Sequence, residues 1–484
     1  MAALLTAGLT LWTVRRTRRA IRHWFDRAVL RAVHQFRVRL DRYKLVSRRA
    51  IREELLHDAV VKQAMDAHAA EHHMEERAVR TSVERYISEI VPQFNVLSYY
   101  KFGYNFARVF INLLYRVESD YVDRQAIHSI PRTDVVVYLV NHRSNADYVV
   151  VAYVLARAVS ISYAVGEWAR VWPLEYVFKS FGAYFVRRGF RDSLYHTVLR
   201  RYVQLITRNG ITQGIFLEGG LSRDGRFRPA KIGLLDSIAT ALPELDTGQD
   251  IKLVPVALNY DRVLEDRHLT HELLERTDRP GRIRQLVGVL HYLSWNVLRF
   301  VTGNLRRYGR VHVTFGTPVS LRAWLAAHPG TLDLPKDERL PRIQALADEM
   351  LGHIAGIIPV TPVPLVAAAI LAVGETAIDR DHLLERIDAL RDEMLRRGAN
   401  LVHPERTPDM ILDRAWRTLR MRRLVVRHGR TYVVLPKQRP LLEYYANSLE
   451  HLLPERSYAS VMHPAHEPDR DLPSLGRWRR APRS

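Results

Sequence analysis

The sequence predicts an α/β fold in which helices flank a largely parallel central sheet. Between residues 133 and 322, short β-branched runs alternate with helical segments. The runs are apolar throughout, which is typical of parallel strands that are buried on both faces. The predicted strands are VVVYLV (135–140), SISYAV (160–165), AYFVRR (183–188), GIFLEGG (214–220), KLVPVAL (252–258) and RVHVTFG (310–316).

A basic helical region is predicted before the sheet, over residues 1–98. From residue 15 to about residue 95, apolar residues recur every three or four positions among arginines, and Pro92 marks a break. Residues 1–52 hold fourteen Lys or Arg against two Asp, a net charge of +12 out of +21 for the chain. This concentration suggests an anionic surface as partner. The alternative explanation is genome composition, since arginine supplies 65 of the 73 basic residues.

Residues 356–464 are predicted to form a small C-terminal domain of helices and one hairpin, following a main domain at 99–355. Pro359, Pro362 and Pro364 lie within six residues, which predicts an extended connection before a helix. The stretch RLVVRHGRTYVVLP is typical of a hairpin turning at His428 and Gly429, so the unit resembles a winged helix. Residues 465–484 are predicted to be a disordered tail.

No segment of the sequence is predicted to span a membrane. The apolar opening covers about fourteen residues, short of the roughly 20 that a spanning helix needs. The run at 285–305 contains His291, Asn296 and Arg299, which indicates an amphipathic helix on the core or at a membrane surface. Cysteine is absent, so thiolate chemistry and disulfides are excluded, and histidine and carboxylates must carry any acid–base catalysis.

The stretch NHRSNAD places a cluster of polar residues between two apolar runs. His142 and Asp147 would lie roughly 140° apart on one continuous helix, too far for contact. If the strand ends near Val140 and a helix begins near Asn145, Asp147 can accept the imidazole N–H and leave the other nitrogen as a general base. The alternative is that His142, Ser144 and Asn145 only cap the helix.

Two arginines, Arg187 and Arg188, end the predicted strand in GAYFVRRGF. Their forked N–H donors suit a phosphate, and the alternative is a solvated pair of charges. In LVPVALNY, Pro255 disfavours a regular central strand and predicts a bend or bulge.

The stretch FLEGGLSRDGRF follows another predicted strand. Its glycines let the backbone approach a ligand closely, so that amides and arginines can surround an oxyanion. The alternative is a glycine-rich turn with exposed charges. The candidate residues are Glu218, Gly219, Gly220, Ser222, Arg223 and Arg226.

The four clusters, in this order, resemble the four motifs of the glycerolipid acyltransferases, and most closely those of the glycerol-3-phosphate acyltransferases. The resemblance continues through VHVTFGTPVSL, PVTPVPLVAAAIL and RPLLEYYANSLEHLLP, and so covers about residues 100–454. Lysophosphatidate acyltransferases usually end after the catalytic domain and usually carry EGT where this sequence has EGG. The resemblance therefore implies an acyltransferase-type domain of the glycerol-3-phosphate branch.

The resemblance also implies a mechanism and a set of roles. His142 would take the proton of the sn-1 hydroxyl of glycerol 3-phosphate while Asp147 orients the imidazole, and the acceptor would attack the thioester of acyl-CoA or acyl-acyl carrier protein. By the same resemblance, Arg187, Arg188 and Arg223 would bind the acceptor phosphate, and Glu218 and Ser222 would position its hydroxyls or the loop. Gly219 and Gly220 would keep the loop close to the substrate. Pro255 would shape the acyl or pantetheine side of the pocket.

No metal and no cofactor beyond the acyl-CoA or acyl-acyl carrier protein co-substrate are expected. Because donor and product are amphiphilic, we expect a peripheral or monotopic protein on the phospholipid surface, at the cytoplasmic face of the cell (inner) membrane, with no nucleic-acid partner.

Two positions depart from the family pattern. Leu221 stands where the family usually has an arginine, and Asn145 stands where it usually has a second histidine. The missing cationic group could be replaced by Arg226 or could indicate another acceptor, dihydroxyacetone phosphate or lysophosphatidate. Two non-catalytic alternatives remain. A nucleic-acid binder using the basic hairpin would leave the four ordered motifs unexplained, and the presence of both His142 and Asp147 argues against a catalytically weakened relative that acts as a scaffold in lipid synthesis.

Overall fold

The computed structural model describes residues 48–92, 111–155, 162–166, 183–187, 189–266, 269 and 309–453. Several expectations lie outside these residues: helices before residue 48, the amphipathic run at 285–305, the tail and Arg188. In the part of the chain that is described, no helix is both long and apolar enough to cross a membrane.

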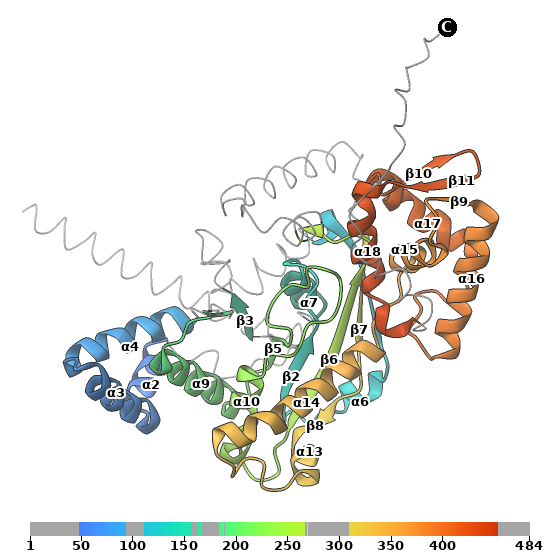
Figure 1. Ribbon diagram of the computed structural model, residues 1–484. Coiled ribbons are helices and arrows are strands. Elements are labelled where there is room, and N and C mark those ends of the chain that lie inside the picture. The colour runs from blue at the N-terminus through green and yellow to red at the C-terminus, as the bar shows by residue number, and fades with distance from the viewer. Residues whose placement is uncertain are drawn as a thin grey trace, which may run out of the picture.

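The main sheet confirms the α/β prediction (Figure 1). Its strands lie in the order β1-β7-β6-β2-β5-β3-β4, with β8 also paired to β6. All neighbours are parallel except β7 and β8, which run antiparallel to β6. The strands are β1 (Tyr115–Tyr121), β2 (Val135–Val140), β3 (Ser162–Gly166), β4 (Tyr184–Val186), β5 (Gln213–Phe216), β6 (Ile251–Tyr260), β7 (Gly309–Phe315) and β8 (Val319–Ser320).

The bend or bulge expected at Pro255 does not interrupt β6, which runs from Ile251 to Tyr260 and keeps a continuous register with β2. Pro255 lies opposite Leu139 of β2, and its carbonyl points to the other side, where it accepts a hydrogen bond from the Gly316 amide at 2.8 Å. On that side β6 changes partner, from β8 at Leu253 to β7 at Val256. The nitrogen of Pro255 therefore faces the position between β8 and β7, away from β2. Its lack of an N–H removes no hydrogen bond between β6 and β2.

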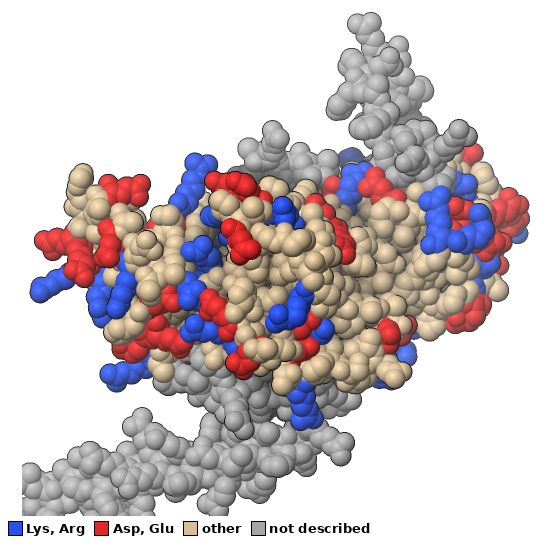
Figure 2. All heavy atoms as spheres, turned by 90° about the horizontal axis from the view of Figure 1, so that it is seen from below, with Lys and Arg blue, Asp and Glu red and all other residues tan. Residues whose placement is uncertain are grey.

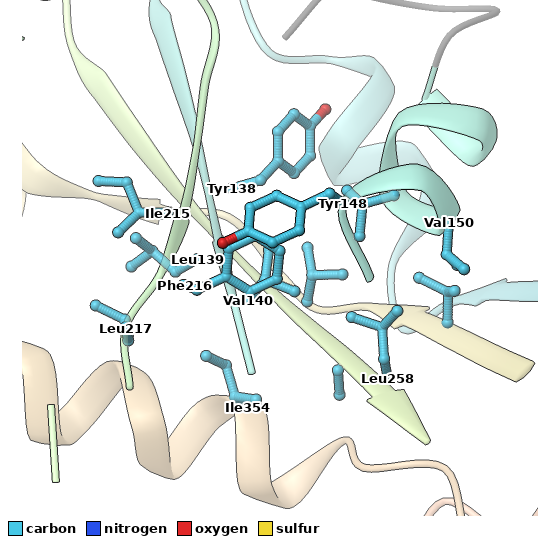
Figure 3. Packing of buried hydrophobic residues seen from close by; sticks show 14 of the residues in the cluster. Tyr138, Leu139, Val140, Tyr148, Val150, Ile215, Phe216, Leu217, Leu258 and Ile354 are labelled. Carbon is cyan, nitrogen blue, oxygen red and sulfur yellow. The ribbon is translucent and has the colours of Figure 1, made fainter. Parts of the chain in front are cut away.

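Helices cover both faces of the sheet. Tyr148 and Val150 of α7 (Asp147–Leu155) reach the core from one side and Ile354 of α14 (Lys336–Gly356) from the other (Figure 3). All six residues of β2 are buried, as their continuous apolar pattern predicts. The other helices of this domain are α6 (Arg124–His128), α9 (Ser193–Arg208), α10 (Gly233–Ala239), the short 3₁₀ helix η4 (Leu242–Glu244) and α13 (Leu321–Ala327).

The described part of the N-terminal region is helical, as predicted. Its helices α2 (Arg48–His57), α3 (Ala59–His72) and α4 (Glu76–Ile90) pack against α9. Arg201 of α9 forms a salt bridge with Asp58, the N-cap of α3, at 2.7 Å. These helices thus pack onto the domain that contains the main sheet.

The C-terminal unit is built around α15 (Pro362–Val373), which contacts α16, α17 and α18. The prolines do not form one extended linker, because Pro362 and Pro364 lie in the first turn of α15, where a helix tolerates proline. The hairpin is present, with Gly429 and Arg430 as its turn, one residue later than expected. The elements are α16 (Arg380–Arg396), α17 (Pro408–Met421), α18 (Arg439–Asn447), β9 (Ala377–Asp379), β10 (Val425–His428), β11 (Thr431–Val434), and the 3₁₀ helices η5 (Pro436–Gln438) and η6 (Glu450–Leu452).

Candidate active site

The polar clusters meet at the carboxyl ends of three neighbouring parallel strands. β2 lies between β5 and β6 in the sheet. His142 follows β2, Glu218 follows β5, and Tyr260 ends β6. Ligands of open parallel sheets bind at this edge, and the strand order explains why segments distant in the sequence come together there.

His142 and Asp147 form a buried hydrogen-bonded pair. Asp147 is the first residue of α7, and its Oδ2 lies 2.9 Å from His142 Nδ1, as the strand–turn–helix prediction requires. The same oxygen accepts the amides of Arg143 at 2.7 Å and Ser144 at 2.9 Å. Because a carboxylate surrounded by donors can only accept, the proton of the imidazole belongs on Nδ1. His142 Nε2 therefore carries the lone pair of a potential base, and it has no hydrogen-bond partner among the described residues.

Aromatic rings hold the imidazole from two sides. The Phe216 ring lies 4.3 Å from the His142 ring, and Tyr148 meets it edge-on at 5.3 Å. Phe216 comes from the end of β5 and Tyr148 from α7, and Figure 3 shows both rings packed in the core next to Val140. The base is thus fixed in an apolar surrounding that excludes bulk water.

Glu218 joins the loop after β5 to the turn after β2. Its Oε1 accepts the His142 amide at 2.9 Å and its Oε2 accepts the Arg228 amide at 3.0 Å. Burial raises the pKa of Glu218, while the charge of Arg143 and the two amides act in the opposite direction. In this structure Glu218 positions the loop, which is one of the two roles expected for it.

The glycine-rich loop is a tight, internally bonded turn. Gly219 has φ 62°, in the left-handed region that favours glycine. The Ser222 amide donates to the His142 carbonyl at 3.1 Å, and its hydroxyl donates to the Arg226 carbonyl at 2.6 Å. Ser222 therefore shapes the loop beside His142. Gly220 follows on the same turn and is buried.

The C-terminal unit closes this loop from outside. A Cβ on Gly225, which has φ 87°, would lie 1.9 Å from the carbonyl oxygen of Tyr444 in α18. The Tyr444 hydroxyl donates to the Arg143 carbonyl at 3.4 Å, and the Arg143 guanidinium donates to the Gly225 carbonyl. The predicted catalytic and C-terminal domains thus share the wall of one site.

Two of the predicted phosphate-binding arginines are committed to carboxylates. Arg187 donates to both carboxylate oxygens of Glu89 in α4, at 2.8 and 2.7 Å, and these hydrogen bonds raise its pKa. Arg226 forms a salt bridge with Glu450 at 2.5 Å, which raises the pKa of Arg226. The donors of Arg187, which were expected at the phosphate, are thus bonded to Glu89, and those of Arg226, considered as a replacement for the cation missing at Leu221, are bonded to Glu450. Arg223 is exposed on the loop.

Sequence patterns did not indicate Tyr260, which contacts Asp147 from the end of β6, or Glu265, which contacts the turn between His142 and Asp147 from the segment after β6. The Tyr260 hydroxyl donates to Asp147 Oδ1, and Glu265 accepts the Ser144 hydroxyl at 2.7 Å. Tyr260 is the last residue of the LVPVALNY stretch, so the position of that strand beside β2 was the available signal. Among the described residues, no group of three or more histidine, aspartate or glutamate side chains could hold a metal ion.

Two protein-family models match segments of the chain that form this site. Residues 122–259 match an acyltransferase family model, and residues 294–472 match the model of the glycerol-3-phosphate acyltransferase C-terminal region. The structure of the 1-acyl-sn-glycerophosphate acyltransferase from Thermotoga maritima aligns with 16% identity and a TM-score of 0.30, over 51% of this chain and 76% of that chain.

Three relatives are each named glycerol-3-phosphate acyltransferase. The protein from Aeromonas hydrophila is 31% identical over 340 residues, 68% of this chain and 40% of the relative. The protein from Actinobacillus succinogenes is 30% identical, and the alignment covers 61% of this chain and 35% of the relative. The protein from Pseudoalteromonas translucida is 26% identical, and the alignment covers 84% of this chain and 50% of the relative. The chain thus spans about half the length of these relatives or less. With both family models matched in sequence order, the chain belongs to the glycerol-3-phosphate acyltransferase family.

Proposed function

We propose that this protein transfers an acyl group from acyl-CoA or acyl-acyl carrier protein to the sn-1 hydroxyl of glycerol 3-phosphate, giving lysophosphatidate. The observation that carries the proposal is the His142 side chain, whose Nδ1 is held by Asp147 while Nε2 has no partner among the described residues. The names of the relatives support glycerol 3-phosphate as the acceptor.

The arrangement supports general-base catalysis. His142 Nε2 takes the proton of the attacking hydroxyl as its oxygen forms a bond to the thioester carbonyl carbon, and Asp147 stabilises the resulting imidazolium. When the tetrahedral intermediate collapses, the carbon–sulfur bond breaks and the proton on Nε2 passes to the departing thiolate. The acyl group ends on the acceptor oxygen, and no covalent acyl-enzyme is formed.

The acceptor phosphate needs cationic partners at the same edge of the sheet. We assign this role to Arg223, which is exposed on the glycine-rich loop, and to Arg188. Arg188 lies outside the described residues, and its assignment rests on its place in the sequence, two residues after the end of β4.

The test is acyl transfer from palmitoyl-CoA to glycerol 3-phosphate, dihydroxyacetone phosphate and lysophosphatidate, with wild type beside His142→Ala. We expect transfer to glycerol 3-phosphate that is lost in the variant. A preference for another acceptor would refute the assigned acceptor while leaving the chemistry intact. A variant as active as wild type would refute the role of His142.

We further propose that the protein works at the surface of the cytoplasmic face of a membrane. Donor and product are amphiphilic, and residues 1–52 carry a net charge of +12, which favours an anionic lipid surface.

A further inference from the structure

We propose that Tyr260 and Glu265 are positioning residues for the transfer reaction, acting on His142 through Asp147 and through the turn at 141–146. This inference rests on the proposed function, because it concerns the same base. Both residues lie at or just beyond the end of β6, outside the stretch that contains His142 and Asp147. Their side chains contact Asp147 and the 141–146 turn from β6, the strand that pairs with β2, and from the segment after it.

Tyr260 fixes the second carboxylate oxygen of Asp147. Oδ2 is occupied by His142 Nδ1 and two backbone amides, and Oδ1 accepts the Tyr260 hydroxyl. Both side chains are buried, and burial followed by the charge of Asp147 raises the pKa of Tyr260 well above its ordinary value. The phenol therefore stays protonated and donates. With both oxygens bonded, the carboxylate cannot rotate away from the imidazole.

Glu265 accepts two hydrogen bonds from the middle of the same turn. Its Oε2 accepts the Ser144 hydroxyl at 2.7 Å, and its Oε1 accepts the Asn145 amide at 3.2 Å. The Ser144 oxygen in turn accepts the Ala146 amide at 3.1 Å. Glu265 thus fixes the two residues that lie midway between the base and its carboxylate partner.

Asn141 supplies a third attachment to β6. Its side chain donates to the Leu258 carbonyl at 3.0 Å and accepts the Leu258 amide at 2.7 Å. The turn is therefore bonded to β6 or the segment after it at its first residue, at its middle and at Asp147. This arrangement matches what a general base needs, because a displacement of about 1 Å can cost roughly 100-fold in rate.

The experiment compares Tyr260→Phe, Glu265→Ala and Glu265→Gln with wild type in steady-state acyl transfer. We expect kcat to fall about 10- to 100-fold in Tyr260→Phe and Glu265→Ala, with the KM of both substrates within about twofold of wild type. Glu265→Gln keeps one acceptor oxygen and should retain more activity than Glu265→Ala. A raised KM with unchanged kcat would overturn the inference, because it would indicate direct substrate binding.

The matched control is Tyr86→Phe. The Tyr86 hydroxyl in α4 donates to the carboxylate of Asp192, the N-cap of α9, and this bond does not reach the 141–146 turn or the segment after β6. The control removes the same kind of bond and should leave kcat unchanged. An equal loss of kcat in the control would assign the effect to general packing and overturn the proposal.

Hydrogen–deuterium exchange gives a readout that does not depend on turnover. In the whole 484-residue chain, the peptide containing Arg143, Ser144 and Asn145 should exchange faster in Glu265→Ala than in wild type, with peptides of β5 unchanged. If wild type transfers to no acceptor, the proposed function fails while the exchange result still decides the positioning role. If wild type is active and the variants match it in kcat and exchange, the positioning role alone fails.

Discussion

Glu89 at the end of α4 accepts both forked donors of Arg187, the residue that follows β4. The guanidinium also lies over the Phe190 ring, 4.5 Å from its centroid. One arginine of the predicted phosphate-binding pair thus joins the N-terminal helices to the edge of the sheet. Substitution of each arginine in turn therefore tests whether Arg187 and Arg188 have different roles.

We expect Arg187→Lys to lower the free energy of unfolding by about 2 kcal/mol, because an ammonium group cannot make both hydrogen bonds. The KM for glycerol 3-phosphate should stay within about twofold of wild type. Arg188→Lys, one residue later, is the matched comparison and should raise that KM with little change in stability. Thermal melts measure the stability of each variant, and substrate titrations measure its KM for glycerol 3-phosphate. A raised KM with unchanged stability in Arg187→Lys would instead support Arg187 as a phosphate ligand.

Glu218→Gln tests the bond between the two motif loops. A glutamine side chain keeps one acceptor oxygen but turns an N–H₂ group toward one of the two amides that Glu218 now accepts, at His142 or Arg228. We expect kcat/KM to fall at least tenfold because His142 is displaced. The measurement is acyl transfer together with a melt. A variant with full activity would show that the position of His142 does not depend on this bond.

Gly225→Ala tests whether α18 closes the site. The new methyl group would meet the Tyr444 carbonyl, so we expect loss of activity and a strong drop in melting temperature. Gly210→Ala is the control, since Gly210 also has a positive φ, 73°, but its methyl group would meet nothing within 4 Å. It should lose only about 1–2 kcal/mol through backbone strain. Equal losses would mean that the contact with α18 contributes nothing.

Local sequence patterns predicted most strands and the geometry of His142 and Asp147. These features depend on apolar runs and on a short turn, both of which are read within a few residues. The partners Tyr260, Glu265 and Glu89 could not be predicted, because they depend on which strands and helices become neighbours. β1 was also missed, since its YRVESDY sequence is mostly polar and its buried partner β7 lies far along the chain.

Two buried groups, Asp261 just after β6 and His312 within β7, should have opposing effects on how stability depends on pH. Burial raises the pKa of Asp261 to about 6, and burial lowers the pKa of His312 to about 4. Between about pH 4 and 6 the native state binds more protons than the unfolded state at Asp261, so this residue makes stability fall as pH rises. At His312 the unfolded state binds more protons between about pH 4 and 6.5, so stability rises with pH.

Single variants should separate the two effects. Asp261→Asn should stabilise the protein by about 3 kcal/mol at pH 7 and have little effect near pH 4. His312→Gln should do the reverse, with a gain of about 3 kcal/mol near pH 4 and little effect at pH 7. Urea unfolding at pH 4, 5, 6 and 7 measures both. Curves of stability against pH that run parallel to wild type in either variant would contradict the assignment for that residue.

The last prediction concerns the membrane surface. Removal of residues 1–47 keeps every described residue, including α2 (Arg48–His57), and removes eleven Lys or Arg against two Asp. Each basic residue near an anionic bilayer contributes about 1 kcal/mol. We therefore expect the truncated protein to lose flotation with vesicles rich in anionic phospholipid, whereas the whole chain floats at low salt and less at high salt.

The C-terminal unit carries a second, more local basic surface. On the face shown in Figure 2, basic and acidic side chains of the described residues are interspersed. A hollow of about 550 Å³ on the C-terminal unit is lined by Trp416, Arg420, Arg423 and Arg427, among others. Replacing these three arginines by glutamate in the whole chain is the control, and it should leave flotation unchanged. Binding that survives the truncation but is lost in the arginine variant would move the membrane contact to this hollow, because charge attracts lipid only where it faces the bilayer.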